Sequence, residues 1–277
     1  MNTPIFGGHE AKVYFIEETN YGETPANPQM AAVGVVREVE PIIDPNLLKV
    51  RGIGSRDLQF LTKGLRQADL KLDYNPQNIN FLQHVMTLTS LSIEVFYEKP
   101  SSIISILHKG CRIDNLKVEV SAEDVMKVTA ELVGQNVIIS TAKAGASYGD
   151  YSGAPVAWYN TYVKKDAETL ENVTDYAFTI KNNLKRVPVI RASEGYLLKY
   201  LPPRHRELNG ELVCDFETKN ELDTVLNDAE FTLEFGLGGT NKATFAGCKW
   251  GSSALSTRAN ELIAQKLPFT AKSVAIS

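Results

Sequence analysis

The sequence predicts a mainly β protein made of tandem β-sandwich or barrel units, each with a short flanking α-helix. Three observations support this class: β-branched and polar residues alternate in many short segments, turn-forming residues separate those segments, and a strand–helix–strand order occurs twice. The chain has 277 residues, enough for one large domain or two of ordinary size. Its hydrophobic content of 43% and charged content of 22% are typical of globular proteins with a conventional core.

The first part of the chain is expected to begin with an extended arm and to continue as strands with one helix. Residues 1–32 alternate short apolar pieces with turn formers, which predicts an arm or loop. A short helix is predicted over 75–86, where Pro76 lies near the start and Ile79 and Leu82 share a face. The predicted strands occupy 33–43 (interrupted by Pro41), 70–74, 90–97, 112–121 and 125–141.

A change of composition in the middle of the chain predicts a linker or long loop. Residues 143–174 combine small residues and turn formers with the charged stretch KKDAETLENVT. The pair Pro202-Pro203 is a firm strand stop, and the periodicity of 259–267 fits a short helix or a strand equally well. The elements predicted after the linker are strands at 176–184, 186–191, 195–201, 211–216, 230–235 and 239–250, and a helix at 218–228.

Three blocks of the sequence recur in the same order in both halves. LKLDYNPQN aligns with ELVCDFETKN, SIEVF aligns with TLEFG, and a Gly-Cys pair occurs in each half. The aligned residues are Asp73 with Asp215 (215 − 73 = 142), Glu94 with Glu234 (234 − 94 = 140), and Gly110-Cys111 with Gly247-Cys248 (247 − 110 = 137). The repeat predicts a duplicated unit of about 140 residues. The alternative is that β proteins repeat such an order without common ancestry, because they draw on a restricted set of residues.

The duplication divides the chain into four parts. These are an extended N-terminal arm at 1–32, a first β unit at 33–142, the linker or long loop at 143–174 and a second β unit at 175–277. In each copy the glycine is interpreted as a turn residue able to take positive φ. The cysteine that follows is interpreted as a small buried apolar residue.

Charge, cysteine content and hydropathy exclude several classes of protein. The formal net charge of −4 excludes a strongly basic nucleic-acid binder. Three widely spaced cysteines form neither a disulfide framework nor a zinc site. The N-terminus lacks a basic region followed by an apolar run, and no stretch approaches 18 consecutive apolar residues. We therefore expect the chain to be made in a reducing cytoplasm and to have no membrane segment.

The sequence offers short catalytic patterns but no constellation. GASYG (145–149) fits G-x-S-x-G with Ser147 as nucleophile, but DYSGAP follows where that motif requires a helix. STAK (140–143) fits S-x-x-K without companion motifs, and the four histidines are isolated from one another. Trp158 and Tyr159 are suited to stacking on a base or sugar, although loop aromatics more often pack a loop onto a core. No catalytic, cofactor-binding or metal-binding residue is predicted, and we expect a protein that is not an enzyme.

A duplicated β unit without a site is typical of a structural subunit whose function lies in its interfaces. Three segments carry a resemblance to a known family: 108–135 (HKGCRIDNLKVEVSAEDVMKVTAELVGQ), 175–190 and 201–218. Together they resemble the tail tube, or major tail, proteins of long-tailed viruses of bacteria and archaea, in order over about residues 33–250. The resemblance implies β-sandwich subunits whose rings close an inner β-barrel and stack into a hollow tube. It implies no catalytic residues and no cofactor.

The resemblance also implies partners and a location. A tail tube in the virion would contact tape-measure and tail-end proteins, pass the viral DNA without specific binding, and be assembled in the host cytoplasm. Tandem members would form trimeric rings with pseudo-sixfold symmetry. Contacts between rings are expected from residues 1–32 and 143–172. The alternatives are a β-rich binding module using Trp158 and Tyr159, another ring-forming tail or secretion-tube component, and a serine hydrolase using Ser147.

Overall fold

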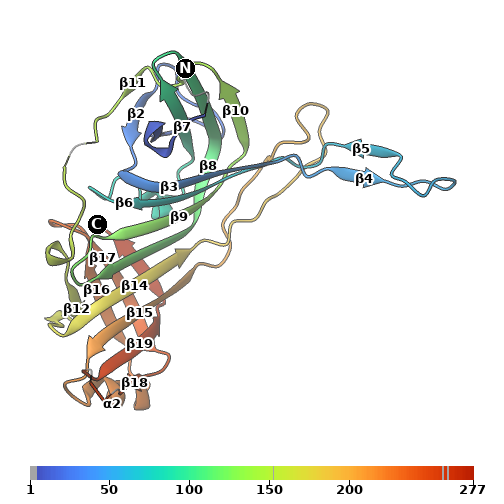
Figure 1. The fold of residues 1–277 in the computed structure, drawn as a ribbon. Coiled ribbons are helices and arrows are strands. Elements are labelled where there is room, and N and C mark those ends of the chain that lie inside the picture. Colours follow the sequence, from blue (N-terminus) through green and yellow to red (C-terminus); the bar gives the residue numbers. More distant parts are fainter. Residues whose placement is uncertain (1–4, 152, 258, 261) are drawn as a thin grey trace.

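The computed structural model describes residues 5–151, 153–257, 259–260 and 262–277, and it shows a protein built mainly of strands (Figure 1). The prediction of a mainly β fold is confirmed. Within the described residues, α-helix is limited to α1 (His84–Thr87) and α2 (Asn220–Leu226), with 3-10 turns at Gly8–Glu10 and Trp158–Asn160. Many strands alternate buried and less buried side chains, because one face of each strand lies on the core and the other faces solvent.

One long antiparallel sheet runs through the molecule and contains strands from both halves of the chain (Figure 1). Its central junction is the pairing of β8 with β14, over seven positions from Asn115↔Lys181 to Ser121↔Asp175. The strands in spatial order are β3 (Val35–Asp44), β6 (Gln67–Asn75), β9 (Lys127–Val133), the second part of β8 (Ser102–Ser121), β14 (Val173–Lys181), β15 (Glu207–Asp215), β19 (Ala264–Thr270) and β18 (Ala254–Ser256).

Two smaller sheets pack against the buried face of the long sheet, and the core lies between the long sheet and these two. Fully buried Leu72, Leu116, Phe178 and Phe245 belong to one continuous apolar cluster. The first small sheet contains β2 (Gln29–Ala32), β1 (Ala11–Glu17), β7 (Leu91–Lys99), the first part of β8 and β10 (Asn136–Ser140), with β11 (Ser147–Tyr148) beside β2. The second contains β13 (Glu168–Thr169), β12 (Val163–Lys165), β16 (Phe231–Gly236), β17 (Lys242–Trp250) and β20 (Ser273–Ile276).

A glycine bulge lets β8 leave one sheet and enter the other. Gly110 has a φ of +65°, and the register of β8 against β7 shifts beside it. β17 does the same at Gly247, whose φ is +63°, with a matching shift against β16. An extra residue of positive φ bends and twists a strand, and glycine adopts that conformation without a steric penalty. The predicted positive φ at both glycines is confirmed, but each glycine lies in a bulge inside a strand and not in a turn.

The pairing registers of the two halves agree position by position. For example, Asn136 pairs with Lys109 in the first half, and Ser273 pairs with Ala246 in the second. Ser273 lies 137 residues after Asn136, and Ala246 lies 137 residues after Lys109. A second bulge also recurs, in β3 against β6 and in β14 against β15. We call residues related in this way matched positions. At an offset of 150, β1 matches β12. At an offset of 140, β6 matches β15, α1 matches α2 and β7 matches β16. At an offset of 137, β3 matches β14, β8 matches β17 together with β18, β9 matches β19, and β10 matches β20.

Several sequence predictions are corrected by the structure. The arm predicted over 1–32 contains β1, a core strand that pairs with β7 along its whole length; the turn formers around it conceal this short apolar run. The predicted linker contains β12, which pairs with β16. Residues 186–201 form no strand beyond an isolated bridge between Val187 and Tyr200, although they are rich in β-branched and apolar residues. The helix predicted over 75–86 is restricted to α1, and 259–267 contributes the start of β19.

Two long connections project together from one end of the long sheet. We call residues 45–66, between β3 and β6, the first arm, and residues 182–206, between β14 and β15, the second arm. The first arm carries the hairpin of β4 (Leu48–Val50) and β5 (Phe60–Thr62), which extends far from the body (Figure 1). The arms contact each other where the Arg66 N–H donates to the Tyr196 carbonyl at 2.7 Å and the Arg66 guanidinium lies over the Tyr196 ring.

Candidate functional site

The long sheet ends in two strands whose outer edges have no partner among the described residues. β3 pairs only with β6, and β18 pairs only with β19. Both edges carry apolar side chains that reach solvent, with Ile43 and Leu255 each 42% exposed. An open edge presents unpaired N–H and C=O groups that can hydrogen-bond to a strand of another chain. In β3 this capacity is reduced at Pro41, which has no N–H.

The face of the long sheet that points away from the core is polar and predominantly acidic. Cross-strand rows such as Glu38–Asp73–Thr129–Lys117–Thr179 lie on this face. Eleven acidic and six basic side chains lie on this face, a balance that disfavours contact with a polyanion. The acidic residues are Glu38, Glu40, Asp44, Asp69, Asp73, Glu119, Glu131, Asp175, Glu207, Glu211 and Asp215, and the basic residues are Lys71, Arg112, Lys117, Lys127, Lys181 and Lys266.

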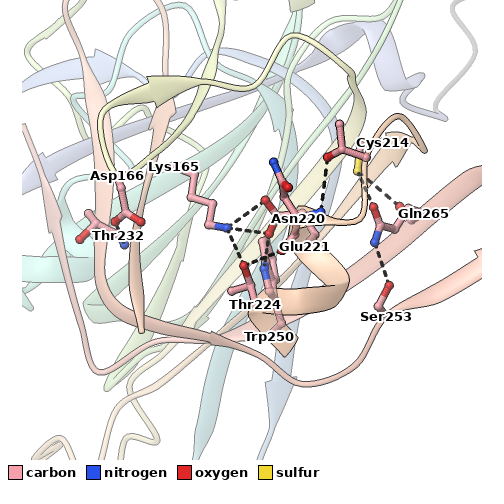
Figure 2. Close-up of polar contacts among 11 residues, drawn as sticks. Lys165, Asp166, Cys214, Asn220, Glu221, Thr224, Thr232, Trp250, Ser253 and Gln265 are labelled. Atoms are coloured by element: carbon pink, nitrogen blue, oxygen red, sulfur yellow. Dashed lines mark hydrogen bonds and ion pairs between the residues drawn. The ribbon is translucent and has the colours of Figure 1, made fainter. Parts of the chain in front are cut away.

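A cluster of polar side chains lies beside α2 in the second half of the chain (Figure 2). Lys165 Nζ from β12 lies 2.9 Å and 2.8 Å from the two carboxylate oxygens of Glu221, and it also contacts Thr224 Oγ1 at 3.2 Å. The Trp250 indole donates to Glu221 Oε2 at 2.6 Å. These groups satisfy one another, so the cluster has the chemistry of a structural ion pair rather than of an acid–base centre.

A cavity of about 470 Å³ opens beside this cluster. Its lining includes Cys214 and Gln265, and the Gln265 amide donates to Ser253 Oγ at 2.9 Å (Figure 2). Burial raises the pKa of the Cys214 thiol to about 11, so the group is a protonated thiol at neutral pH and a poor nucleophile. The described residues contain no group of three or more His, Cys, Asp or Glu side chains placed to hold a metal ion.

The residues considered from the sequence as catalytic or binding candidates lie in separate parts of the molecule. Ser147 lies in the two-residue strand β11 beside β2, and none of the hydrogen bonds among the described residues joins its hydroxyl to a histidine or carboxylate. Trp158 and Tyr159 form a 3-10 turn and are 44% and 72% exposed. Cys111, Cys214 and Cys248 are buried free thiols, as the sequence predicts for Cys111 and Cys248.

A match to the phage tail tube protein family covers residues 8–271. The chain belongs to the phage tail tube protein family. It is therefore a structural component of a virion, as the resemblance implies. No curated protein matches the chain. Among the described residues, no helix is both long and apolar enough to cross a lipid bilayer.

The arms are the part of this tail tube protein that the sequence reasoning missed. Residues 45–66 contain five Lys or Arg and one Asp, and 182–206 contain six and one Glu, so together they carry 11 − 2 = +9. The remainder of the chain carries (29 − 11) − (33 − 2) = −13. Exposed apolar residues accompany these charges, with Ile53 and Ile190 fully exposed and Phe60 67% exposed. This segregation of charge is visible in the sequence and could have identified both arms.

Proposed function

We propose that the protein is the tail tube subunit of its virus and assembles with copies of itself into rings that stack into the hollow tube. The observation that carries this proposal is the long sheet, which spans both halves and ends in two open edges. Membership of the tail tube family supports the same function. A sheet with an open edge on each side joins other copies head to tail, and such joints close into a ring when the rotation permits.

Each chain supplies two units of the ring. The matched registers and the two recurrent bulges support a duplicated ancestor, with β12 as the first strand of the second unit in place of the boundary at residue 175. If the ancestral ring contained six units, three chains complete it. The ring is then a trimer with pseudo-sixfold symmetry.

The polar face of the long sheet lines the lumen of the tube. Its excess of carboxylates repels the phosphates of DNA, so the genome passes without binding. The same lumen holds the tape-measure protein during assembly, and tail-end proteins close the tube, as in the family. Assembly takes place in the host cytoplasm.

The two arms make the contacts between stacked rings. They replace residues 1–32 and 143–172 in this role, because β1, β2 and β12 in those segments are paired within the body. Arms of charge +9 are attracted to a body of charge −13 in a neighbouring ring. Stacking should therefore weaken as salt is raised, while ring closure through backbone hydrogen bonds should not.

Electron microscopy of the purified protein tests this function. We expect rings or hollow tubes with threefold or pseudo-sixfold views at rising protein concentration, and a shift from tubes to separate rings at high salt. Sedimentation velocity on the same samples gives the mass of the ring species. A chain that stays monomeric at every concentration and salt, both alone and with tail-tip complexes added as initiator, contradicts the proposal.

A further inference from the structure

We propose that neighbouring chains join by pairing β3 of one copy with β18 of the next, in the register with which β14 joins β8 inside a single chain. This inference rests on the proposed function, because it names the joint that closes the ring. It needs no assumption about the partner beyond a second copy, since the chain already contains one example of the joint.

The joint inside the chain is a continuous strand pairing that is buried on its core side. β8 and β14 pair over seven positions, among them Glu119↔Ala177 and Val118↔Phe178. The core side of this pairing excludes solvent completely at its centre, with Val118, Phe178 and Ile180 each 0% exposed. Burial of this kind is what a strand added to an apolar edge gains.

The two open edges are the matched positions of these two strands. β3 matches β14, because both carry the bulge at the same point, after Val36 in one and after Val173 in the other. β18 matches the second part of β8, since Ala254↔Lys266 reproduces Lys117↔Thr129 at an offset of 137. Transferring the register of the internal joint gives the pairs Glu40↔Ser256, Pro41↔Leu255, Ile42↔Ala254 and Ile43↔Ser253 between copies.

Side chains at the open edges are exposed where their matched positions are buried. Ile43 is 42% exposed, whereas its matched residue Ile180 is 0% exposed. Leu255 is likewise 42% exposed against 0% for Val118. Hydrophobic side chains at these places are expected if a second copy covers them, as the two halves cover each other.

The ends of the two helices show the same difference. The two ends of the second arm cover α1: Asn182 Nδ2 donates to the Val85 carbonyl at 3.0 Å, and Arg206 Nη1 lies 3.8 Å from Met86 Sδ. Leu226 of α2 matches Met86 and is 82% exposed. In the proposed joint, the start of the next copy's first arm covers Leu226.

Paired cysteines test the register directly. We choose Glu40→Cys with Ser256→Cys, because both residues are exposed on the polar face and are predicted to lie opposite each other. Opposed residues of an antiparallel pair have Cα atoms about 4.5–5.5 Å apart, within the range that a disulfide spans. The native thiols do not interfere, since Cys111, Cys214 and Cys248 are buried and burial raises the pKa of each.

The matched control is Glu40→Cys with Ser252→Cys, which moves one thiol four residues along the edge, about 13 Å. Under mild oxidation of assembled rings we expect the first variant to lose its monomer band on non-reducing gels and to give dimers and closed trimers. The control should remain monomeric on the same gel. A third variant, Lys117→Cys with Thr179→Cys, reports the internal joint, forms its disulfide within one chain and shows that the oxidation works.

The outcomes separate the joint from the function. Rings that form while the first variant stays uncrosslinked, or while the control crosslinks instead, overturn the proposed register and leave the tube function standing. A protein that forms no rings under any condition overturns both. Circular dichroism of the variants establishes that each is folded before oxidation.

Discussion

The two halves of the molecule place different chemistry at the same position beside their helices. In the first half, Phe15 packs against Phe81 with ring centroids 5.0 Å apart, and both side chains are buried. The matched positions in the second half are Lys165 and Glu221, which form an ion pair with side chains 15% and 17% exposed. The contact from Phe15 to His84 is likewise replaced by the contact from Lys165 to Thr224.

The difference follows from what covers each helix. The second arm shields α1, so apolar rings beside it bring a full gain from burial. No segment of the same chain among those described shields α2, and the ion pair there keeps part of its hydration. A partly solvated pair avoids part of the desolvation penalty that a fully buried pair meets. One framework thus tolerates either solution, and the degree of enclosure selects between them.

Truncating a side chain beside α1 or beside α2 should therefore lower the stability by unequal amounts. The larger loss is expected beside α1, where the aromatic rings pack. Phe81→Ala removes a buried ring and leaves a cavity, which we expect to lower the free energy of unfolding by about 3–5 kcal/mol. Glu221→Ala should cost about 1–3 kcal/mol, because it removes hydrogen bonds from Lys165 and Trp250 that water can partly replace. Urea unfolding of unassembled protein measures both. Equal losses would mean that enclosure does not distinguish the two sites.

The two bulge glycines offer a finer comparison of matched positions. Alanine at Gly110 or Gly247 must keep a positive φ, which costs about 1–2 kcal/mol in each case. The added Cβ at 110 would lie 2.7 Å from Gln135 Cβ, near the backbone, whereas at 247 it would lie 2.7 Å from Lys272 Cδ, far along a flexible chain. We expect Gly110→Ala to lower the thermal unfolding midpoint more than Gly247→Ala. The reverse order would show that the backbone around residue 135 yields easily.

Mild acid should act on the first half through its two buried histidines. Burial lowers the pKa of His84 and of His108 below 6.5. Glu17 partly opposes the shift at His84, and the Ala68 carbonyl, followed by Asp69, partly opposes it at His108. The neutral forms therefore stabilise the fold above pH 6.5, and this contribution is lost as the pH falls below 6.5. The matched residues in the second half are Thr224 and Phe245, which do not titrate.

The variant His108→Phe introduces the residue that the second half already uses at this position. We expect the drop in unfolding temperature between pH 7 and pH 5 to become smaller in this variant, since each unit of lowered pKa corresponds to about 1.4 kcal/mol. His205→Phe is the control, because His205 is exposed. An unchanged pH dependence in His108→Phe would assign acid sensitivity to other groups.

The local sequence pattern was sufficient to predict those elements whose conformation depends mainly on their own residues. The alternation in LKLDY and EFTLEF predicted strands that are present as parts of β6 and β16, and TKNELDTVLND predicted the helix that contains α2. The Gly-Cys pairs predicted positive φ and buried thiols, because only glycine enters that region of φ freely and free cysteine packs as a small apolar residue. The repeat was visible, although the first block aligned two residues away from the pairing register, which matches Asp73 with Val213.

Tertiary structure alone decided which strands meet and which remain open. Strand β1 in the predicted arm gains its stability from β7, about 80 residues away in the chain, and no local pattern encodes such a partner. The apolar segment at 186–201 is the opposite case: it has the composition of a strand, but it pairs with none of the sheets, has only the isolated bridge between Val187 and Tyr200, and forms part of the second arm. Side-chain chemistry sets the faces of strands over a few residues, whereas edges, joints and coverage depend on contacts between distant segments.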